Sequence, residues 1–311
     1  MGNPETKDHG TGHIIQSLLV NVVIAIFKGI AAFITGSGAM FAETIHSFAD
    51  CANQLLLLVG VRQSRRLPNE KHPIGYGRAA YFWSFMVAML LFSVGGMFSV
   101  YEGVHKFNHP EPVEDIVWAL AVIFFAIVLE GYSTISNIKE INKRKGNKSF
   151  FGYISGTKDS DLIVVFGENS AAVLGLIVAL VALLAAYFTG DGRYDAIGSV
   201  IIGLILILVA VFLATEVKSL LIGESADPNI IEGIYSTAAT QTGIIEVVNC
   251  RTVQQGPGEV LACVKINCQP TLTTLELSTI INSFEHQLRT KHPEIKWLYI
   301  EPDVQEWKQN K

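Results

Sequence analysis

Long apolar runs alternate with short polar segments over most of the chain. Six of the runs are long enough to cross the hydrocarbon of a bilayer, which takes roughly 20 residues of helix. They cover residues 13–35, 39–62, 79–104, 113–138, 161–188 and 194–220. Lipid offers no partner to backbone polar groups, so each run is expected to be helical. The pattern therefore predicts an all-α domain of six transmembrane helices.

The pattern changes after residue 220. Residues 229–240 are expected to form a helix, and 244–253 and 260–267 two strands around the turn "QQGPGE". A helix capped near Thr273 or Thr274 and a last strand, "IKWLYIEP", complete the order αββαβ. The sequence thus predicts a six-span transmembrane domain over residues 1–222. A small α+β, ferredoxin-like cytoplasmic domain is predicted over residues 223–311.

Composition agrees with a protein of the lipid bilayer. The chain is 50% hydrophobic and 16% charged, whereas soluble domains are about 25% charged. Its net charge of -5 argues against nucleic acid as a partner. The N-terminus lacks a basic segment followed by a short apolar core, so the sequence indicates no secretory signal.

Basic residues gather in two of the loops. They are Arg62, Arg65, Arg66, Lys71 and Arg78 after the second run, and Lys139, Lys143, Arg144, Lys145, Lys148 and Lys158 after the fourth. Because basic loops stay in the cytoplasm, both of these loops are predicted there. Both termini are then cytoplasmic too, and a bacterial inner membrane is the simplest location.

Polar residues interrupt the second run in the stretch "ETIHSFADCANQ". Placing a charged group at the middle of a membrane costs about 2.5–3.5 kcal/mol of free energy on insertion scales. These residues are therefore expected to have a function that offsets this cost. Glu43, His46 and Asp50 share one helical face, together with the amides that follow them. His46 and Asp50 stand at i and i+4, where an imidazole and a carboxylate can hold one divalent cation between them.

Two ligands are too few for Zn²⁺, which usually takes four. The fifth run supplies Glu168 and Asn169 among small residues that permit close helix approach. The predicted metal ligands are therefore His46, Asp50, Glu168 and Asn169. The alternative for His46 and Asp50 is a buried, hydrogen-bonded pair.

Further polar groups lie inside the other runs. A helix rises about 1.5 Å per residue, so the number of residues to the end of a run gives a depth in the membrane. By this count Lys28 in the first run and Glu43 in the second both lie toward the outer side. They are predicted to form a structural ion pair. Asn21, Glu43 and Glu130 are candidate accessory groups of the metal site, with helix–helix contact as the alternative for Asn21 and Glu130.

At these positions the sequence resembles the cation diffusion facilitator family, in its zinc transporter 9-like branch. "AETIHSFADCANQ" resembles the HxxxD motif of the second span, and "KHPIGYGR" resembles the loop motif HPYGxGR. "GENSAAVLGL" and "YDAIGSVIIG" resemble the fifth and sixth spans of the branch, so the resemblance covers nearly the whole chain.

The resemblance implies a transporter and not an enzyme. Such a protein would carry Zn²⁺ or a similar divalent cation out of the cytoplasm or matrix, in exchange for protons. It would act as a homodimer with paired cytoplasmic domains. Zinc would be the transported substrate, and no organic cofactor is implied.

The fifth span departs from the family pattern. Most members have HxxxD or DxxxD there, whereas the residue four after Glu168 is Ala172, and Asn169 replaces the usual aspartate of the branch. The site would hold fewer nitrogen and more oxygen ligands, which admits Mn²⁺, Fe²⁺ or Co²⁺ more readily.

Proton exchange is expected at the same ligands, because metal binding requires them to be deprotonated. His46 is the natural exchanger, since histidine ordinarily titrates near physiological pH. Three alternatives stay open: a transporter for another divalent ion, a non-transporting metal-binding membrane scaffold, and an intramembrane hydrolase. Asn169 motivates the scaffold, whereas neighbouring helix positions face apart, which disfavours Ser47 or Cys51 as a nucleophile beside His46.

Overall fold

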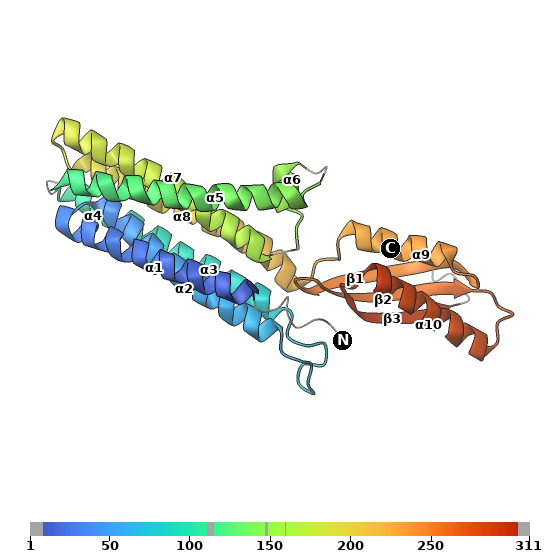
Figure 1. The fold of residues 1–311 in the computed structure, drawn as a ribbon. Coiled ribbons are helices and arrows are strands. Elements are labelled where there is room, and N and C mark those ends of the chain that lie inside the picture. Colours follow the sequence, from blue (N-terminus) through green and yellow to red (C-terminus); the bar gives the residue numbers. More distant parts are fainter. Residues whose placement is uncertain (1–8, 111–114, 147–148, 159, 304–311) are drawn as a thin grey trace. The chain divides into compact units, whose positions relative to one another are not determined.

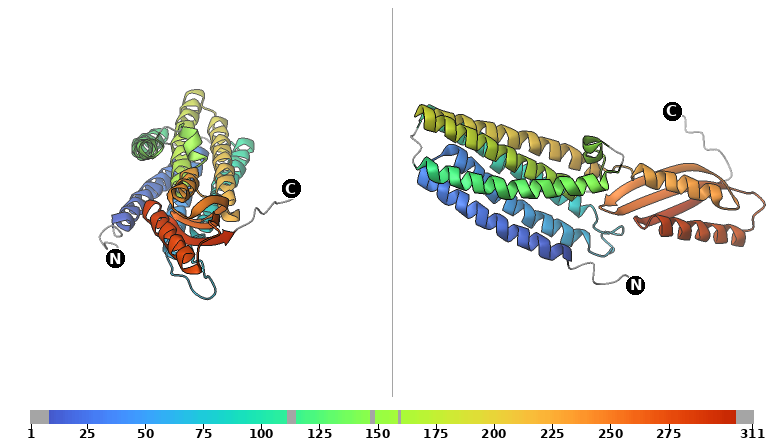
Figure 2. Two further views of the ribbon diagram at one scale, coloured as in Figure 1. Left: turned by 90° about the vertical axis from the view of Figure 1, so that its right-hand side faces the viewer. Right: turned by 45° about the horizontal axis from the view of Figure 1, so that its top comes forward.

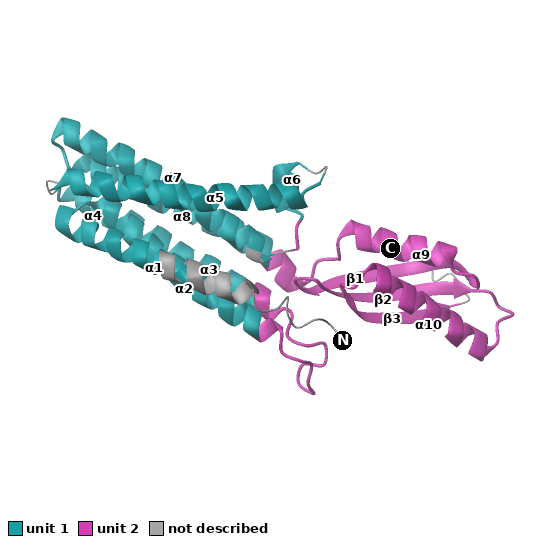
Figure 3. Cartoon of the chain, in the orientation of Figure 1, with its two compact units in different colours: residues 1–62, 82–156, 160–217 teal, residues 63–81, 157–159, 218–311 magenta. Residues whose placement is uncertain are grey.

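The computed structural model describes residues 9–110, 115–146, 149–158 and 160–303. The chain forms two compact units (Figure 3). The first comprises residues 1–62, 82–156 and 160–217, and the second residues 63–81, 157–159 and 218–311. The second unit thus takes in the loop after the second long helix as well as the C-terminal part. The domain boundary at residues 222 and 223 stays a prediction.

The first unit is a bundle of long helices that run alongside one another (Figures 1 and 2). Its uninterrupted long helices are α1 (His9–Thr35), α2 (Gly38–Ser64), α5 (Ile116–Arg144), α7 (Ser160–Thr189) and α8 (Arg193–Ile222). A further long helix consists of α3 (Ala79–Leu90), the π-helical segment η2 (Leu91–Met97) and α4 (Phe98–Asn108). Together with the short α6 (Phe150–Ile154), these confirm the predicted all-α domain with six long helices.

Length and hydropathy mark four of the described helices as able to cross a membrane. They are Ala79–Asn108, Ile116–Arg144, Leu162–Thr189 and Arg193–Ile222. In α1 the described apolar segment is shorter and covers only Asn21–Thr35. In α2 the polar residues lower the mean hydropathy of the helix. Large apolar side chains point away from the bundle, with Phe33 90% and Phe188 80% exposed. Such a surface is expected to face lipid.

Glycines let α8 approach the η2–α4 helix closely. A Cβ added to Gly203 would lie 2.7 Å from the backbone nitrogen of Val100 and 2.8 Å from the carbonyl oxygen of Gly96. Small residues at such contacts bring helix backbones together, which is how helices associate in lipid.

A carboxylate of α8 caps the first turn of α2. Asp195 is 2% exposed and accepts hydrogen bonds from Ser37 Oγ at 2.6 Å and from Gly38 N at 2.5 Å. Ala39 N donates to the same carboxylate at 3.3 Å. The first N–H groups of a helix have no partner within the helix. Asp195 therefore satisfies these donors and ties the start of α2 to α8.

The second unit has a three-stranded sheet with two helices on one face. β1 (Ile244–Gly256) pairs antiparallel with β2 (Glu259–Cys268), which pairs parallel with β3 (Ile295–Asp303). α9 (Pro228–Thr240) and α10 (Thr274–Lys291) pack on alternate residues of β2 to form one core. A capping box of Thr273 and Glu276 begins α10. The predicted αββαβ order is confirmed.

The element ends differ from those predicted. α5 continues to Arg144, past the predicted end at residue 138, because an apolar run reports the lipid-buried part of a helix and not its polar extension. The predicted first residue of that run, Val113, lies outside the described residues. The π-helical segment has no sequence signature, since one extra residue in a turn leaves the apolar run unbroken.

Candidate cation site

α2 carries the predicted pair His46 and Asp50 into the bundle. His46 is fully buried, and the Asp50 side chain is 13% exposed. His46 Nε2 lies 3.5 Å from Asp50 Oδ2. Two ligands about 2.1 Å from a tetrahedral Zn²⁺ are about 3.4 Å apart. The two ligand atoms therefore have the separation that one shared divalent cation requires.

α7 brings Glu168 to the same face of α2. Glu168 is 6% exposed and accepts a 2.6 Å hydrogen bond from Asn53 Nδ2, one turn after Asp50. The charges of Glu168 and Asp50 act on each other. Ala171 and Ala172 are buried beside Glu168, and small residues of this kind let α7 pack close to its neighbours. The structure thus brings three predicted ligands to one region.

Buried polar atoms without a hydrogen-bond partner gather along this face of α2. They are Glu43 Oε1, His46 Nδ1 and Nε2, Asp50 Oδ1, Asn53 Oδ1 and Gln54 Oε1. Elsewhere in the described chain, Asn137 Nδ2 and Glu294 Oε2 are the remaining buried side-chain atoms in this condition. Leaving a buried polar atom unpaired costs about 1–3 kcal/mol. Oxygens and an imidazole with lone pairs unused suit a cation and not an anion.

Asn169 lies at a different place from Glu168. Its Nδ2 is 3.3 Å from Ser133 Oγ on α5. There it lines a groove of about 1000 Å³ between α5 and α7, together with Ser136 and Asn137. The structure therefore directs the Asn169 amide toward α5, and its role as a ligand stays a prediction.

The accessory candidates lie on α1 and α5. Glu130 is half-buried, and its charge acts on both Asp50 and Glu168. Asn21 is half-buried on α1, two turns before Lys28. Both roles stay predictions.

Lys28 is fully buried and reaches α2. Its Nζ lies 3.2 Å from Glu43 Oε2 and donates to Ser47 Oγ at 2.9 Å. The two residues expected to pair are thus in contact, while the structural role assigned to them stays a prediction.

No three His, Cys, Asp or Glu side chains within the described residues form a ready metal cluster. Glu168 is bonded to Asn53, beside the point that His46 and Asp50 share. A cation held by all three ligands would require Glu168 to exchange that hydrogen bond for the ion.

Two residues that position α2 are not apparent from the sequence. Asn53 was placed on the polar face but not paired with Glu168. Asp195 was missed entirely, and the available signal was an acidic residue in the first turn of its own helix.

Comparison with known proteins adds the family. Residues 14–222 match the cation efflux transmembrane domain. That match covers more than half of the chain and includes α2 and α7, which carry the predicted ligands. The chain belongs to the cation efflux family. Membership of this family of transporters confirms the resemblance seen in the motifs, and also the expectation that the chain is not an enzyme.

Relatives of this cation efflux protein include zinc antiporters. The "Proton-coupled zinc antiporter SLC30A9, mitochondrial" of Xenopus laevis is 32% identical over 249 residues, which are 79% of this chain and 44% of the relative. Its human counterpart is 30% identical over 254 residues, 81% of this chain and 45% of the relative. The chain spans less than half the length of these relatives.

Two further likenesses are more distant. The "Zinc transporter ZitB" of Escherichia coli (strain K12) is 26% identical over 233 residues, 73% of this chain and 67% of the relative. A solved structure of the MamM-CTD matches 25% of this chain and 96% of its own, with 18% identity and a TM-score of 0.24.

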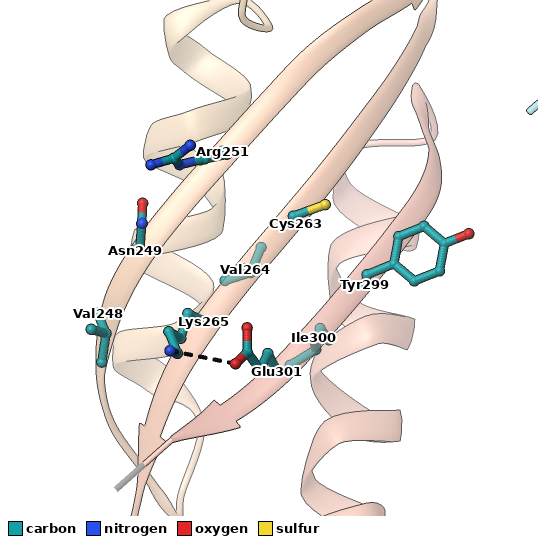
Figure 4. A pocket seen from close by; sticks show the side chains of 9 residues that line it. All are labelled: Val248, Asn249, Arg251, Cys263, Val264, Lys265, Tyr299, Ile300 and Glu301. Atoms are coloured by element: carbon teal, nitrogen blue, oxygen red, sulfur yellow. Dashed lines mark ion pairs between the residues drawn. The ribbon is translucent and has the colours of Figure 1, made fainter. Parts of the chain in front are cut away.

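The sheet of the second unit has a hollow of about 890 Å³ (Figure 4). Arg251, Cys263 and Tyr299 stand side by side across its three strands. Lys265 forms ion pairs with Glu301 at 3.4 Å and with Asp303 at 2.8 Å. The hydrogen bond to Asp303 raises the pKa of Lys265. These carboxylates are thus already paired with a lysine, unlike Asp50 on α2, whose ion-pair contact is with His46.

Proposed function

We propose that this protein moves divalent metal cations, Zn²⁺ foremost, out of the cytoplasm in exchange for protons. One observation carries the proposal: His46 Nε2 and Asp50 Oδ2 lie 3.5 Å apart on a buried face where several further oxygens, Asp50 Oδ1 and Asn53 Oδ1 among them, lack hydrogen-bond partners. The names of the SLC30A9 relatives, zinc antiporters coupled to protons, support the choice of ion and of counter-ion.

His46 and Asp50 are the first ligands of the transported ion in this proposal. Glu168 completes the set when it leaves Asn53, and Asn169 adds a further oxygen only when its amide turns away from Ser133 on α5. Two carboxylates and a neutral imidazole then balance the charge of one divalent cation.

Protons return on the same groups. A ligand must lose its proton to bind a metal ion, so cation and protons compete for these side chains. His46 is one of these groups, because an imidazole can carry either a proton or a metal ion on the same ring nitrogen. Access alternates between the two sides of the membrane as helices rock around the site.

The setting of the site is proposed on the same footing. The chain lies in a bilayer as a homodimer. Both of its termini lie in the cytoplasm, because the two basic loops are expected on that side. A bacterial inner membrane is the location that we infer.

Oxygen-rich coordination keeps Mn²⁺, Fe²⁺ and Co²⁺ as alternative cargo. The amide of Asn169 adds no negative charge, and this observation favours a second candidate, a metal-binding scaffold that does not transport.

The test is flux into liposomes that contain the purified chain and a metal-sensitive dye. Zn²⁺, Mn²⁺, Fe²⁺ and Co²⁺ are compared with and without a pH gradient. Asp50→Asn removes a proposed ligand charge. Glu285→Gln is the matched control: it makes the same chemical change at a half-buried partner of Arg289 on α10. We expect gradient-driven zinc flux in the wild type and the control, and none in Asp50→Asn.

Each other outcome has a defined meaning. Flux of a different ion reassigns the substrate and keeps the site. Binding without flux of any ion favours the scaffold. Full zinc flux in Asp50→Asn contradicts the site assignment.

A further inference from the structure

Two pairs of polar side chains lie next to each other on α2, and both have i,i+4 spacing. His46 and Asp50 form one pair, and Glu43 and Ser47 form the other. Each member of the second pair precedes its counterpart by three residues, so the pairs share one side of the helix. The two pairs therefore offer two adjacent places for a cation.

The second pair already holds a positive charge. Lys28 Nζ lies 3.2 Å from Glu43 Oε2 and 2.9 Å from Ser47 Oγ. Lys28 and Glu43 are 0% exposed, and Ser47 is 4% exposed. The ammonium thus stands between two oxygen ligands of α2, as a cation from solution would.

This arrangement has more ligand capacity than the ion pair uses. Glu43 Oε1 is fully buried and has no hydrogen-bond partner. It lies against Gly175 on α7, where an added Cβ would collide with that oxygen. A pair built for stability alone would be expected to satisfy both carboxylate oxygens, because an unpaired buried acceptor is costly. Glu43 therefore keeps one carboxylate oxygen that could still bind a cation.

Charge counting also leaves room for a second ion. Glu43, Asp50, Glu130 and Glu168 carry four negative charges when ionised. With Lys28 and one divalent cation, one negative charge remains, whereas two divalent cations without the lysine would neutralise the four carboxylates. The lysine therefore stands where a second ion would be electrostatically acceptable.

We propose that the Lys28 ammonium permanently occupies a second cation position at Glu43 and Ser47, so that each chain binds one divalent ion and not two. This inference rests on the proposed function, since it takes the polar face of α2 to be a cation pathway. It assigns Lys28 the role of fixing the number of ions bound.

The test counts Zn²⁺ bound to the 311-residue chain in lipid nanodiscs by equilibrium dialysis. Lys28→Ala removes the ammonium and opens space, and we expect one more zinc ion per chain than in the wild type. Lys28→Arg keeps the charge and should bind the wild-type number. The double variant with Lys28→Ala and Glu43→Gln removes the carboxylate as well and should also return to the wild-type number.

Lys28→Gln guards against misfolding of Lys28→Ala. Its amide can still donate to Glu43 while offering an oxygen to a cation, so an extra zinc ion is expected there too. A wild-type zinc count in folded Lys28→Ala and Lys28→Gln would overturn the inference.

Asp50→Asn separates this inference from the proposed function. If Asp50→Asn binds as much zinc as the wild type, then the proposed transport site fails, whatever the Lys28 variants do. If Asp50→Asn loses one zinc ion and the Lys28 variants gain none, then only the second position is refuted.

Discussion

Replacing Asp195 by alanine should loosen the start of α2. The carboxylate accepts hydrogen bonds from Ser37 Oγ, Gly38 N and Ala39 N, all inside the protein. Hydrogen bonds to a charged group contribute about 1.5–3 kcal/mol each, although losses at one site are not additive. The Ser37 hydroxyl can turn to another acceptor, whereas the two N–H groups are fixed by the helix. We therefore expect Asp195→Ala to lower the free energy of unfolding by about 3 kcal/mol.

The assay is unfolding of the first unit in mixed micelles, followed together with amide hydrogen exchange. Faster exchange is expected at Gly38 and Ala39 in particular, because these amides lose their acceptor. Ser199→Ala is the matched control, since it removes one neutral hydrogen bond to the carbonyl of Gly38 and should cost about 1 kcal/mol. A loss below 1 kcal/mol in Asp195→Ala, with unchanged exchange at both amides, would refute the view that α8 caps α2.

Other perturbations address the remaining elements. Gly175→Ala should displace Glu43, because Glu43 Oε1 occupies the space that the new methyl group would take. We expect reduced zinc flux in liposomes with a near-normal yield of folded protein. Normal flux would show that transport does not need Glu43 in this position. Thr273→Ala should destabilise α10 by about 1 kcal/mol through loss of its cap, read as faster hydrogen exchange in the first turn of that helix. The hydrogen bond from the Thr273 backbone holds the pKa of Glu276 below its ordinary value. Stability from this contact is therefore present above the ordinary pKa and is lost as the pH falls through the lowered one. Hydrogen-exchange protection in that turn, taken relative to the intrinsic rate at each pH, should therefore fall on acidification, and unchanged protection would contradict this.

Local spacing made part of the site predictable. His46 and Asp50 meet because residues four apart on a helix always lie near each other. The six long helices were predictable for a similar reason, since an apolar run of that length has few alternatives. Lys28 and Glu43 were expected to meet because both lie toward the outer side of neighbouring helices, and the structure places them in contact.

Contacts that depend on the rotation of a helix were not predictable. Glu168 and Asn169 are adjacent on α7, yet one bonds Asn53 on α2 and the other Ser133 on α5. α7 is apolar nearly all round, so its sequence does not indicate which side faces α2. Asp195 and Ser37 are separated by 158 positions, and no local pattern links the start of α8 to the start of α2.

X-ray absorption of the zinc-loaded chain tests the central claim most directly, because it reports the atoms around the bound ion. The account predicts one imidazole nitrogen and otherwise oxygen ligands at about 2.0–2.2 Å, with the imidazole signal lost in His46→Asn. Sulfur ligands near 2.3 Å, or an imidazole signal that persists in His46→Asn, would contradict a cation site built on His46 and Asp50.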